Sequence, residues 1–144
     1  MKFKELPVFN KVMIFIVSVS MVFVCFMNLF KVSRVVGVCM EPTIHDDAVI
    51  MGCSVLRDFK AGDIVMFFKE GMCMVKRIAY VGGETVERNG EILTVPDKCY
   101  YMLGDNSWNS YDSRYWEDPF VPEKYIIAKV IVTDVKQAIH DLTD

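Results

Sequence analysis

The sequence predicts a mainly β domain, a folded antiparallel sheet or barrel, preceded by one N-terminal transmembrane helix. Three observations lead to this prediction: a long apolar segment near the N-terminus, short runs of β-forming residues after it, and glycine-containing turns between these runs. Strands at intervals of about 8–12 residues with such turns are typical of an all-β sheet or barrel. The 144 residues suffice for one domain with its own core.

The apolar segment, residues 12–30, contains no charged residue and is bracketed by Lys11 and Lys31. As a helix rising about 1.5 Å per residue it spans roughly 28 Å, close to the ~30 Å hydrocarbon core of a bilayer. A cleaved signal peptide is the alternative. Its apolar core is typically ~7–15 residues long and ends in a small-x-small site. This segment is longer and runs into "NLFKVSRVV", so we expect a retained anchor.

These features divide the chain into a short cytoplasmic N-terminus (1–11), the anchor (12–30) and an extracytoplasmic domain (32–144). The basic residues on either side of the anchor favour this orientation weakly under the positive-inside rule. Residues 32–144 contain 12 Lys and Arg against 18 Asp and Glu, a net charge of −6. An acidic domain is a poor nucleic-acid binder, so the expected neighbour is the lipid bilayer.

The strands are expected in runs separated by turn residues: 32–38, 48–55, 63–68, 73–81, 84–88, 91–95, 99–104 and 125–135. The Asn89-Gly90 pair predicts a tight hairpin, because both residues accept positive φ. Outside the anchor, only the C-terminal tail has room for a helix. Residues 104–119 form a long polar segment that also carries four aromatic residues, which indicates an ordered, functional loop.

The cysteines and histidines give little support for a metal site. No CxxC motif exists, and the two histidines, His45 and His140, are 95 positions apart. No cofactor is implied. In an exported domain a disulfide among Cys53, Cys73 and Cys99 is an open alternative, with the pair undetermined.

Four motifs follow one another in order: "CMEPT" from Cys39, "GDIV" from Gly62, "VKRIAYVGGE" from Val75 and "GDNSWNSYDSR" from Gly104. Together they resemble the type I signal peptidases of the bacterial serine-lysine kind, from Val35 to about Val130, and the family also has such an anchor. The resemblance implies a mostly β domain on the outer face of the bacterial cytoplasmic membrane. It also implies an endopeptidase that removes signal peptides from exported preproteins, while the oligomeric state stays undetermined.

The sequence departs from the family at one place, because the family's nucleophilic serine aligns with Cys39. A thiol is the stronger nucleophile and needs less help from a base. The resemblance gives Lys76 the role of that base, which requires an uncharged amine near neutral pH. Alternation along a strand places Met74, Lys76 and Ile78 on one apolar face. The alternatives are a snorkelling lysine at a strand edge and a cysteine that is simply a small buried residue.

Further roles are carried over from the family pattern. Ser110 aligns with the serine that hydrogen-bonds the catalytic lysine, with a turn serine as the alternative. Asp112 and Arg114 align with a salt bridge that braces the loop.

Three residues are expected at the substrate. Gly37 allows close approach of a peptide backbone, Met74 lies on the Lys76 face, and Met40 is expected near the substrate pockets and the lipid surface, or else as core filler. The edges offered by 34–38 and 72–77 suit an added peptide strand.

Three other interpretations remain. The chain could be a signal peptidase relative that binds signal peptides without efficient cleavage, because its nucleophile has changed. It could be a self-cleaving repressor-type protease of the same fold, which the membrane span disfavours. Histidine-using signal peptidases are a third class, disfavoured because Lys76 stands at the position of that histidine.

Overall fold

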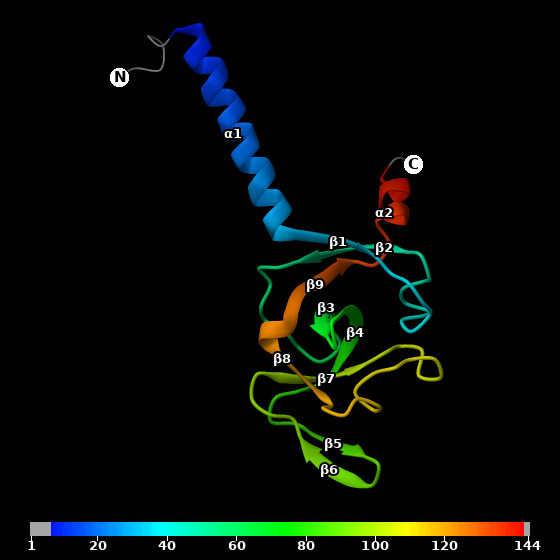
Figure 1. The fold of residues 1–144 in the computed structure, drawn as a ribbon. Helices are drawn as coiled ribbons and strands as arrows, with labels where there is room; N and C mark the ends of the chain where they lie inside the picture. Colours follow the sequence, from blue (N-terminus) through cyan, green and yellow to red (C-terminus); the bar gives the residue numbers. More distant parts are fainter. Residues whose placement is uncertain (1–6, 143–144) are drawn as a thin grey trace.

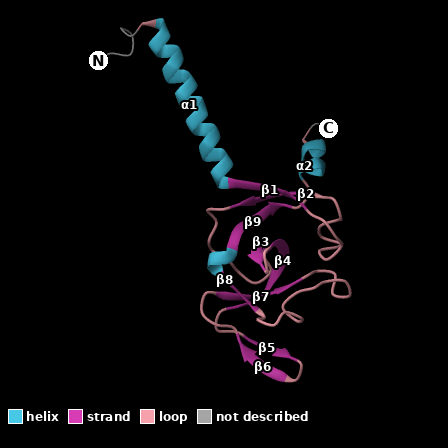
Figure 2. Ribbon diagram, viewed as in Figure 1, coloured by secondary structure: helices cyan, strands magenta, loops and turns pink. Residues whose placement is uncertain are grey.

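The computed structural model describes residues 7–142 as one projecting helix on a β domain (Figures 1 and 2). Residues 1–6, part of the expected cytoplasmic N-terminus, lie outside the described residues. The elements in chain order are α1 (Val8–Leu29), β1 (Phe30–Arg34), β2 (Val49–Cys53), β3 (Ile64–Lys69), β4 (Met72–Val81), β5 (Thr85–Arg88), β6 (Glu91–Thr94), β7 (Cys99–Leu103), β8 (Phe120–Pro122), the 3₁₀ helix η2 (Glu123–Tyr125), β9 (Ile126–Val132) and α2 (Val135–Asp141).

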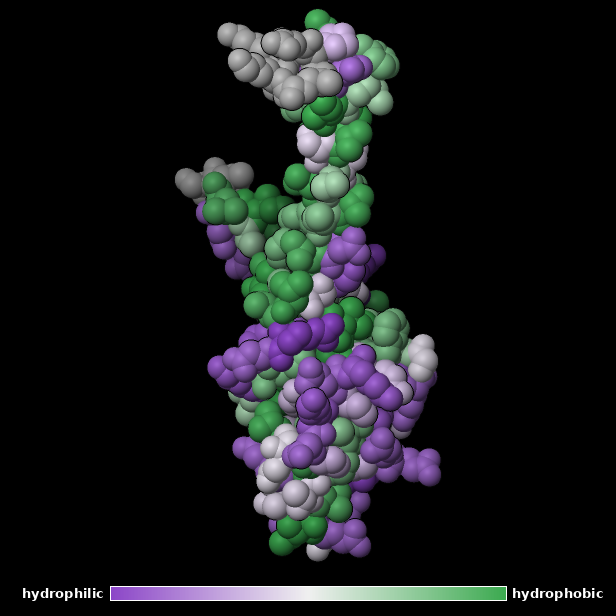
Figure 3. All heavy atoms as spheres, turned by 90° about the vertical axis from the view of Figure 1, so that its left-hand side faces the viewer, coloured by the Kyte–Doolittle hydropathy of each residue, from purple (hydrophilic) through white to green (hydrophobic). Residues whose placement is uncertain are grey.

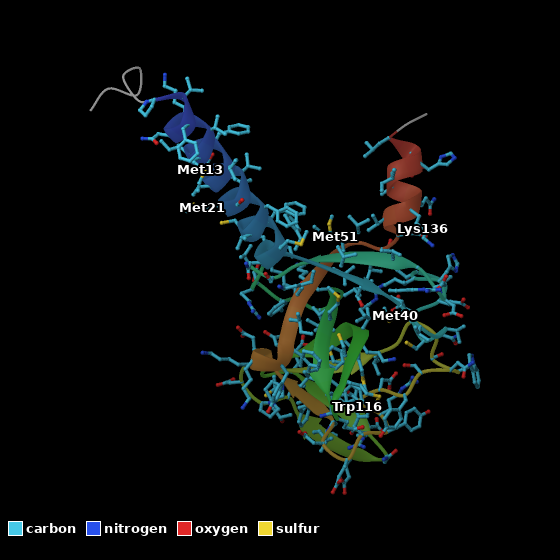
Figure 4. The ribbon with its side chains drawn as sticks, turned by 45° about the horizontal axis from the view of Figure 1, so that its top comes forward. Met13, Met21, Met40, Met51, Trp116 and Lys136 are labelled. Carbon is cyan, nitrogen blue, oxygen red and sulfur yellow. The ribbon has the colours of Figure 1, made fainter. Side chains whose placement is uncertain are left out.

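Helix α1 is long and apolar enough to cross a membrane, by length and composition. It begins four residues before the expected span of 12–30 and ends one residue before its end. None of its residues is buried against the domain, and it stands as a mostly green column above a largely purple and white body (Figure 3). Met13 and Met21 project from it well away from the sheet (Figure 4).

The domain is built on one seven-stranded sheet with the order β1-β2-β9-β3-β4-β7-β8, and every adjacent pair is antiparallel. The sheet folds so that β1, β2 and β9 lie toward α1, while β7 and β8 lie on the opposite side of β3 and β4 (Figure 1). Strands β5 and β6 form a separate hairpin. The predicted fold class, a folded antiparallel sheet preceded by one apolar helix, is confirmed.

Each expected run contains a strand, with two differences. The first strand occupies Phe30–Arg34 in place of 32–38, because α1 leads directly into it and the chain leaves the sheet after Arg34. Strand β8 was not expected, since it has only three residues, includes Pro122 and follows Pro119. The Asn89-Gly90 hairpin is confirmed by φ values of 54° and 84°.

The central strand β3 joins two parts of the core. Val65 and Phe67 point into one hydrophobic cluster, and Ile64 and Met66 point into a second cluster on the other face. Trp116, from the long loop, is fully buried in the first cluster (Figure 4). The long loop is therefore packed onto the sheet and is ordered, as its aromatic content indicates.

All five cysteines lie in the described part of the chain and are free thiols, so the disulfide considered among Cys53, Cys73 and Cys99 is not formed.

Candidate active site

Lys76 is a buried lysine on strand β4. Alternation along the strand turns Lys76 and Ile78 inward, and Lys76 is only 4% exposed. Its Nζ donates a hydrogen bond to Ser110 Oγ at 3.1 Å. Among residues 7–142, no carboxylate forms an ion pair with this amine. A snorkelling lysine would hold its amine in water, so the geometry does not match that alternative.

Cys39 and Lys76 line the same cavity of about 250 Å³. The remaining lining comes from residues 33–36 and 73–75. Cys39 is partly exposed, and its sulfur has no hydrogen bond to the Lys76 amine. A larger cavity of about 710 Å³ lies between the β3–β4 hairpin and β8, but none of its lining residues is Cys39, Lys76 or Ser110. We therefore take the smaller cavity as the candidate site.

The backbone around Cys39 is held from the long loop. Asn106 donates its N–H to the Cys39 carbonyl at 3.0 Å and its side-chain amide to the Val38 carbonyl at 3.1 Å. Within the described chain, nothing accepts a hydrogen bond from the Cys39 N–H. Gly37 has a φ of +101°, and its N–H bonds Asp46 Oδ1 at 2.8 Å. The segment therefore offers an unpaired backbone donor next to a thiol.

Gly104 makes this arrangement sterically feasible. A Cβ at this position would lie 2.1 Å from Ser110 Oγ and 2.6 Å from the Cys39 carbonyl oxygen. Both distances are far below van der Waals contact, so no side chain fits between the two segments. Sequence reasoning used this glycine only as part of a motif, although the close approach it permits brings Ser110 and Cys39 together.

Asp112 anchors the loop that carries Ser110. Its carboxylate is fully buried and accepts bonds from Arg114 Nε and Nη2 at 2.8 Å each, and from the Gly104 N–H at 3.0 Å. Burial raises the pKa of the Asp112 carboxyl, but hydrogen bonds from Arg114, Gly104 and Ser110 outweigh it and bring the pKa below its usual range. The expected Asp112–Arg114 pair is thus formed, and it reaches Ser110.

A second ion pair ties the motifs together. Arg77 donates Nε–H and Nη2–H to the two carboxylate oxygens of Asp105, at 2.7 Å and 2.6 Å, and Thr43 donates to the same carboxylate at 2.5 Å. Burial raises the pKa of the Asp105 carboxyl, but the hydrogen bonds from Arg77 and Thr43 outweigh it and bring the pKa below its usual range. Neither Arg77 nor Asp105 is among the predicted site residues. Because one is a basic and the other an acidic residue of successive motifs, the sequence could have indicated an ion pair between them.

Two strand edges border the cavity. Strand β7 pairs only with Arg77–Val81 of β4, so the stretch from Met72 to Lys76 has one edge without a partner strand. Strand β1 is the outermost strand on its side of the sheet. Both edges leave backbone groups available to an extended peptide.

The two predicted methionines, Met74 and Met40, lie in different places. Met74 lines the cavity. Met40 does not: it is completely buried and packs with Ile44 and Ile50 in the second core cluster (Figure 4). This placement corresponds to the core-filling alternative and not to a position at substrate or lipid. Within residues 7–142, no cluster of three or more metal-binding side chains is present.

The motifs that begin at Cys39 and Val75 line one cavity. The long-loop motif contacts them through Ser110 and Asn106, and Gly62 of the remaining motif accepts a hydrogen bond from Arg77. Comparison with known proteins assigns the chain to one family. The family model described as "Signal peptidase, peptidase S26" matches residues 8–99 and 89–133. The chain belongs to the signal peptidase family. Membership in this family, with the apolar helix α1, indicates a membrane-anchored protein.

Individual signal peptidases are also similar to this chain in sequence. Signal peptidase I of Bacillus amyloliquefaciens is 34% identical over 122 residues, covering 60% of this chain and 66% of that protein. Signal peptidase I of Buchnera aphidicola subsp. Baizongia pistaciae is 60% identical over 37 residues, covering 26% of this chain and 11% of that protein. Signal peptidase I of Bacillus licheniformis is 26% identical over 149 residues, covering 77% of this chain and 80% of that protein. This chain thus spans just under two thirds of the first relative and much less of the second.

Proposed function

We propose that this protein is a membrane-bound endopeptidase that removes signal peptides from exported preproteins, with Cys39 as nucleophile and Lys76 as proton carrier. The observation that supports this most is the buried Lys76 amine, held by Ser110 at the cavity that Cys39 also lines. The predicted anchor, residues 12–30, holds it in the bacterial cytoplasmic membrane, and residues 32–144 act on the outer face.

The chemistry proceeds in two halves. Cys39 Sγ attacks the scissile carbonyl carbon, its proton passes to the uncharged Lys76 amine, and the new oxyanion accepts a hydrogen bond from the Cys39 N–H. The C–N bond then breaks, and Lys76 gives the proton to the leaving amine. Water attacks the resulting thioester and loses a proton to Lys76. The C–S bond breaks, and the Cys39 thiolate recovers that proton.

The neighbouring residues position this pair. Ser110 fixes the Lys76 amine by the 3.1 Å hydrogen bond, and the Asp112–Arg114 pair fixes the loop that carries Ser110. Among residues 7–142, no carboxylate forms an ion pair with the amine. The approach of sulfur to nitrogen occurs when substrate closes the cavity, since catalytic hydrogen bonds are often long in free enzymes.

Substrate binds as an extended strand between the free edge of β4 and the segment that continues β1. Main-chain hydrogen bonds to these edges set its register. Gly37 allows the peptide backbone to approach, and Met74 lines the cavity with Cys39. A cavity of about 250 Å³ suits small side chains next to the scissile bond, as in small-x-small cleavage sites.

Two observations favour a second function, that of a relative which binds signal peptides without efficient cleavage. The nucleophile position carries a cysteine, and its sulfur is not hydrogen-bonded to the Lys76 amine. Retention of Lys76, Ser110 and the whole supporting loop favours the enzyme.

The test is cleavage of a preprotein by the full chain in detergent, beside Cys39→Ser, Cys39→Ala and Lys76→Ala. The proposal predicts cleavage that a thiol alkylator stops and that both alanine variants lose. Activity restricted to Cys39→Ser would identify an inactivated relative. Undiminished cleavage by Cys39→Ala would refute the assignment.

A further inference from the structure

The turn Asn106–Asn109 stands directly beside Cys39 but outside its cavity. Asn106 bonds the carbonyls of Val38 and Cys39, and the Asn109 N–H closes the turn on the Asn106 carbonyl at 3.1 Å. No residue of the turn lines the cavity. The turn therefore borders the nucleophile from outside the cavity that would take the signal peptide.

The turn is held at a second point. Arg114, fixed by its pair with the buried Asp112, donates Nη2–H to the Ser107 carbonyl at 3.2 Å. These bonds restrain the backbone before the next residue, and the Asn109 N–H bond restrains it after that residue. Little conformational entropy remains to be lost when a ligand docks on that residue.

That next residue is Trp108, whose side chain is 95% exposed. The chain contains only one other tryptophan, Trp116, which is fully buried. Tryptophan is enriched among the residues that dominate binding energy at interfaces. A fully exposed indole on a doubly restrained turn is thus presented for contact with another molecule.

Its position identifies the ligand. Two residues extend at most about 7 Å, so Trp108 lies within that distance of Asn106, which contacts Cys39. An extended peptide advances about 3.3 Å per residue. A peptide attacked at Cys39 therefore reaches Trp108 within about four residues of the scissile bond. The loop lies near β7, away from α1, so a lipid surface is the less suitable partner (Figure 1).

We propose that Trp108 binds the first residues on the mature side of the scissile bond, and that it selects for apolar or aromatic side chains there. This inference rests on the proposed function, because it takes Cys39 as the point of cleavage. The long loop then has two roles: Ser110 positions the Lys76 amine, and Trp108 binds the part of the substrate that is released after cleavage.

The experiment measures binding without turnover, using the full-length Cys39→Ala variant in detergent. One peptide ends at the scissile bond, and a second extends four residues beyond it with a leucine among them. Acrylamide quenching reports on the exposed Trp108, while the buried Trp116 serves as an internal reference. The extended peptide should protect Trp108 and bind roughly 10- to 30-fold more tightly than the short one.

Three variants test whether Trp108 causes the tighter binding of the extended peptide. Trp108→Ala should abolish the advantage of the extended peptide, and Trp108→Phe should keep most of it. Ile92→Ala, which removes another exposed apolar side chain on the remote β5–β6 hairpin, should change nothing. In the chain with Cys39 intact, Trp108→Ala should raise KM for an extended substrate with kcat unchanged.

The outcomes separate the two proposals. If the intact chain cleaves but both peptides bind equally, or vesicles without peptide protect Trp108 as well as the extended peptide does, the Trp108 inference fails alone. If neither peptide binds and the intact chain cleaves nothing, the proposed function fails and this inference falls with it.

Discussion

Ser110 and Ser113 are two buried serines of one loop whose replacement separates catalysis from stability. Ser110 accepts a bond from the Lys76 amine at 3.1 Å, and Ser113 accepts one from the Met102 N–H at 2.8 Å. Alanine at either position leaves one buried donor unpaired, and Ser110→Ala also removes the hydrogen bond from Ser110 to the Asp112 carboxylate. The expected loss is about 1–3 kcal/mol of unfolding free energy. For a chain of this length this lowers Tm by roughly 3–12 °C.

The effects on cleavage should differ. In Ser110→Ala the Lys76 amine loses its hydrogen bond to Ser110, and a misplaced catalytic group costs about 10²-fold in kcat. Ser113→Ala leaves that bond intact, so its kcat should stay near that of the unchanged chain. Peptide cleavage in detergent and urea unfolding of the same preparations measure both quantities. The pH dependence of kcat should change only in Ser110→Ala.

Two results would refute this reasoning. One is a Ser110→Ala variant with unchanged kcat and pH profile. The other is an equal loss of kcat in both variants at equal loss of stability, which would reduce Ser110 to a structural residue.

Three further predictions concern the groups that hold the site together. Gly104→Ala should lower the unfolding free energy by about 1–3 kcal/mol and abolish most cleavage, because its Cβ would overlap Ser110 and the Cys39 carbonyl. Urea unfolding measures the first effect, and a cleavage assay measures the second. Arg77→Lys should cost roughly 1 kcal/mol in the same unfolding experiment, since a lysine cannot form both bonds to its partner carboxylate and the pair is partly exposed. The pKa of the Asp112 carboxyl is lower in the folded chain than in the unfolded chain, where it is about 3.9. This difference stabilises the fold at pH values above about 3.9, and the stabilisation is lost as the pH falls through the lower folded-state pKa. Unfolding free energy measured against pH should therefore be level above about pH 5 and decline below about pH 4, with a shallower decline in Asp112→Asn.

Each of these has a contradicting result. A Gly104→Ala variant as stable and active as the unchanged chain would mean that the two segments are not in close contact. Equal stability of Arg77→Lys would remove the case for a two-point bond. A stability curve in Asp112→Asn that declines as steeply at low pH as the original would assign acid sensitivity to other carboxylates.

Local signals predicted most of the fold. Alternation and turn residues located the strands, and the Asn89-Gly90 pair fixed a hairpin. Strand β8 was not predicted, because its three residues, one of them a proline, carry no periodic pattern. Its pairing with β7 is a long-range contact. The end of β1 was misplaced because the valines after Arg34 suit a strand, although the chain leaves the sheet there.

The site was predictable where a strand pattern or a motif applied. Alternation placed Lys76 on the inner face of β4, and the motif paired Asp112 with Arg114. Met40 lies in an irregular segment, where no period indicates which side chains turn inward. The contacts of Thr43 and Arg77 with Asp105 cross 62 and 28 positions of the chain, so they depend on how the sheet folds.

The central claim is that the Cys39 thiol performs the cleavage, and mapped alkylation tests it most directly. In a Cys73→Ser background, which removes the other thiol of the cavity, iodoacetamide is added in steps. Mass spectrometry gives the alkylated fraction of Cys39, and the same samples are assayed for preprotein cleavage. The lost fraction of cleavage activity should equal the alkylated fraction of Cys39 at every step. Complete alkylation of Cys39 with cleavage retained would contradict it.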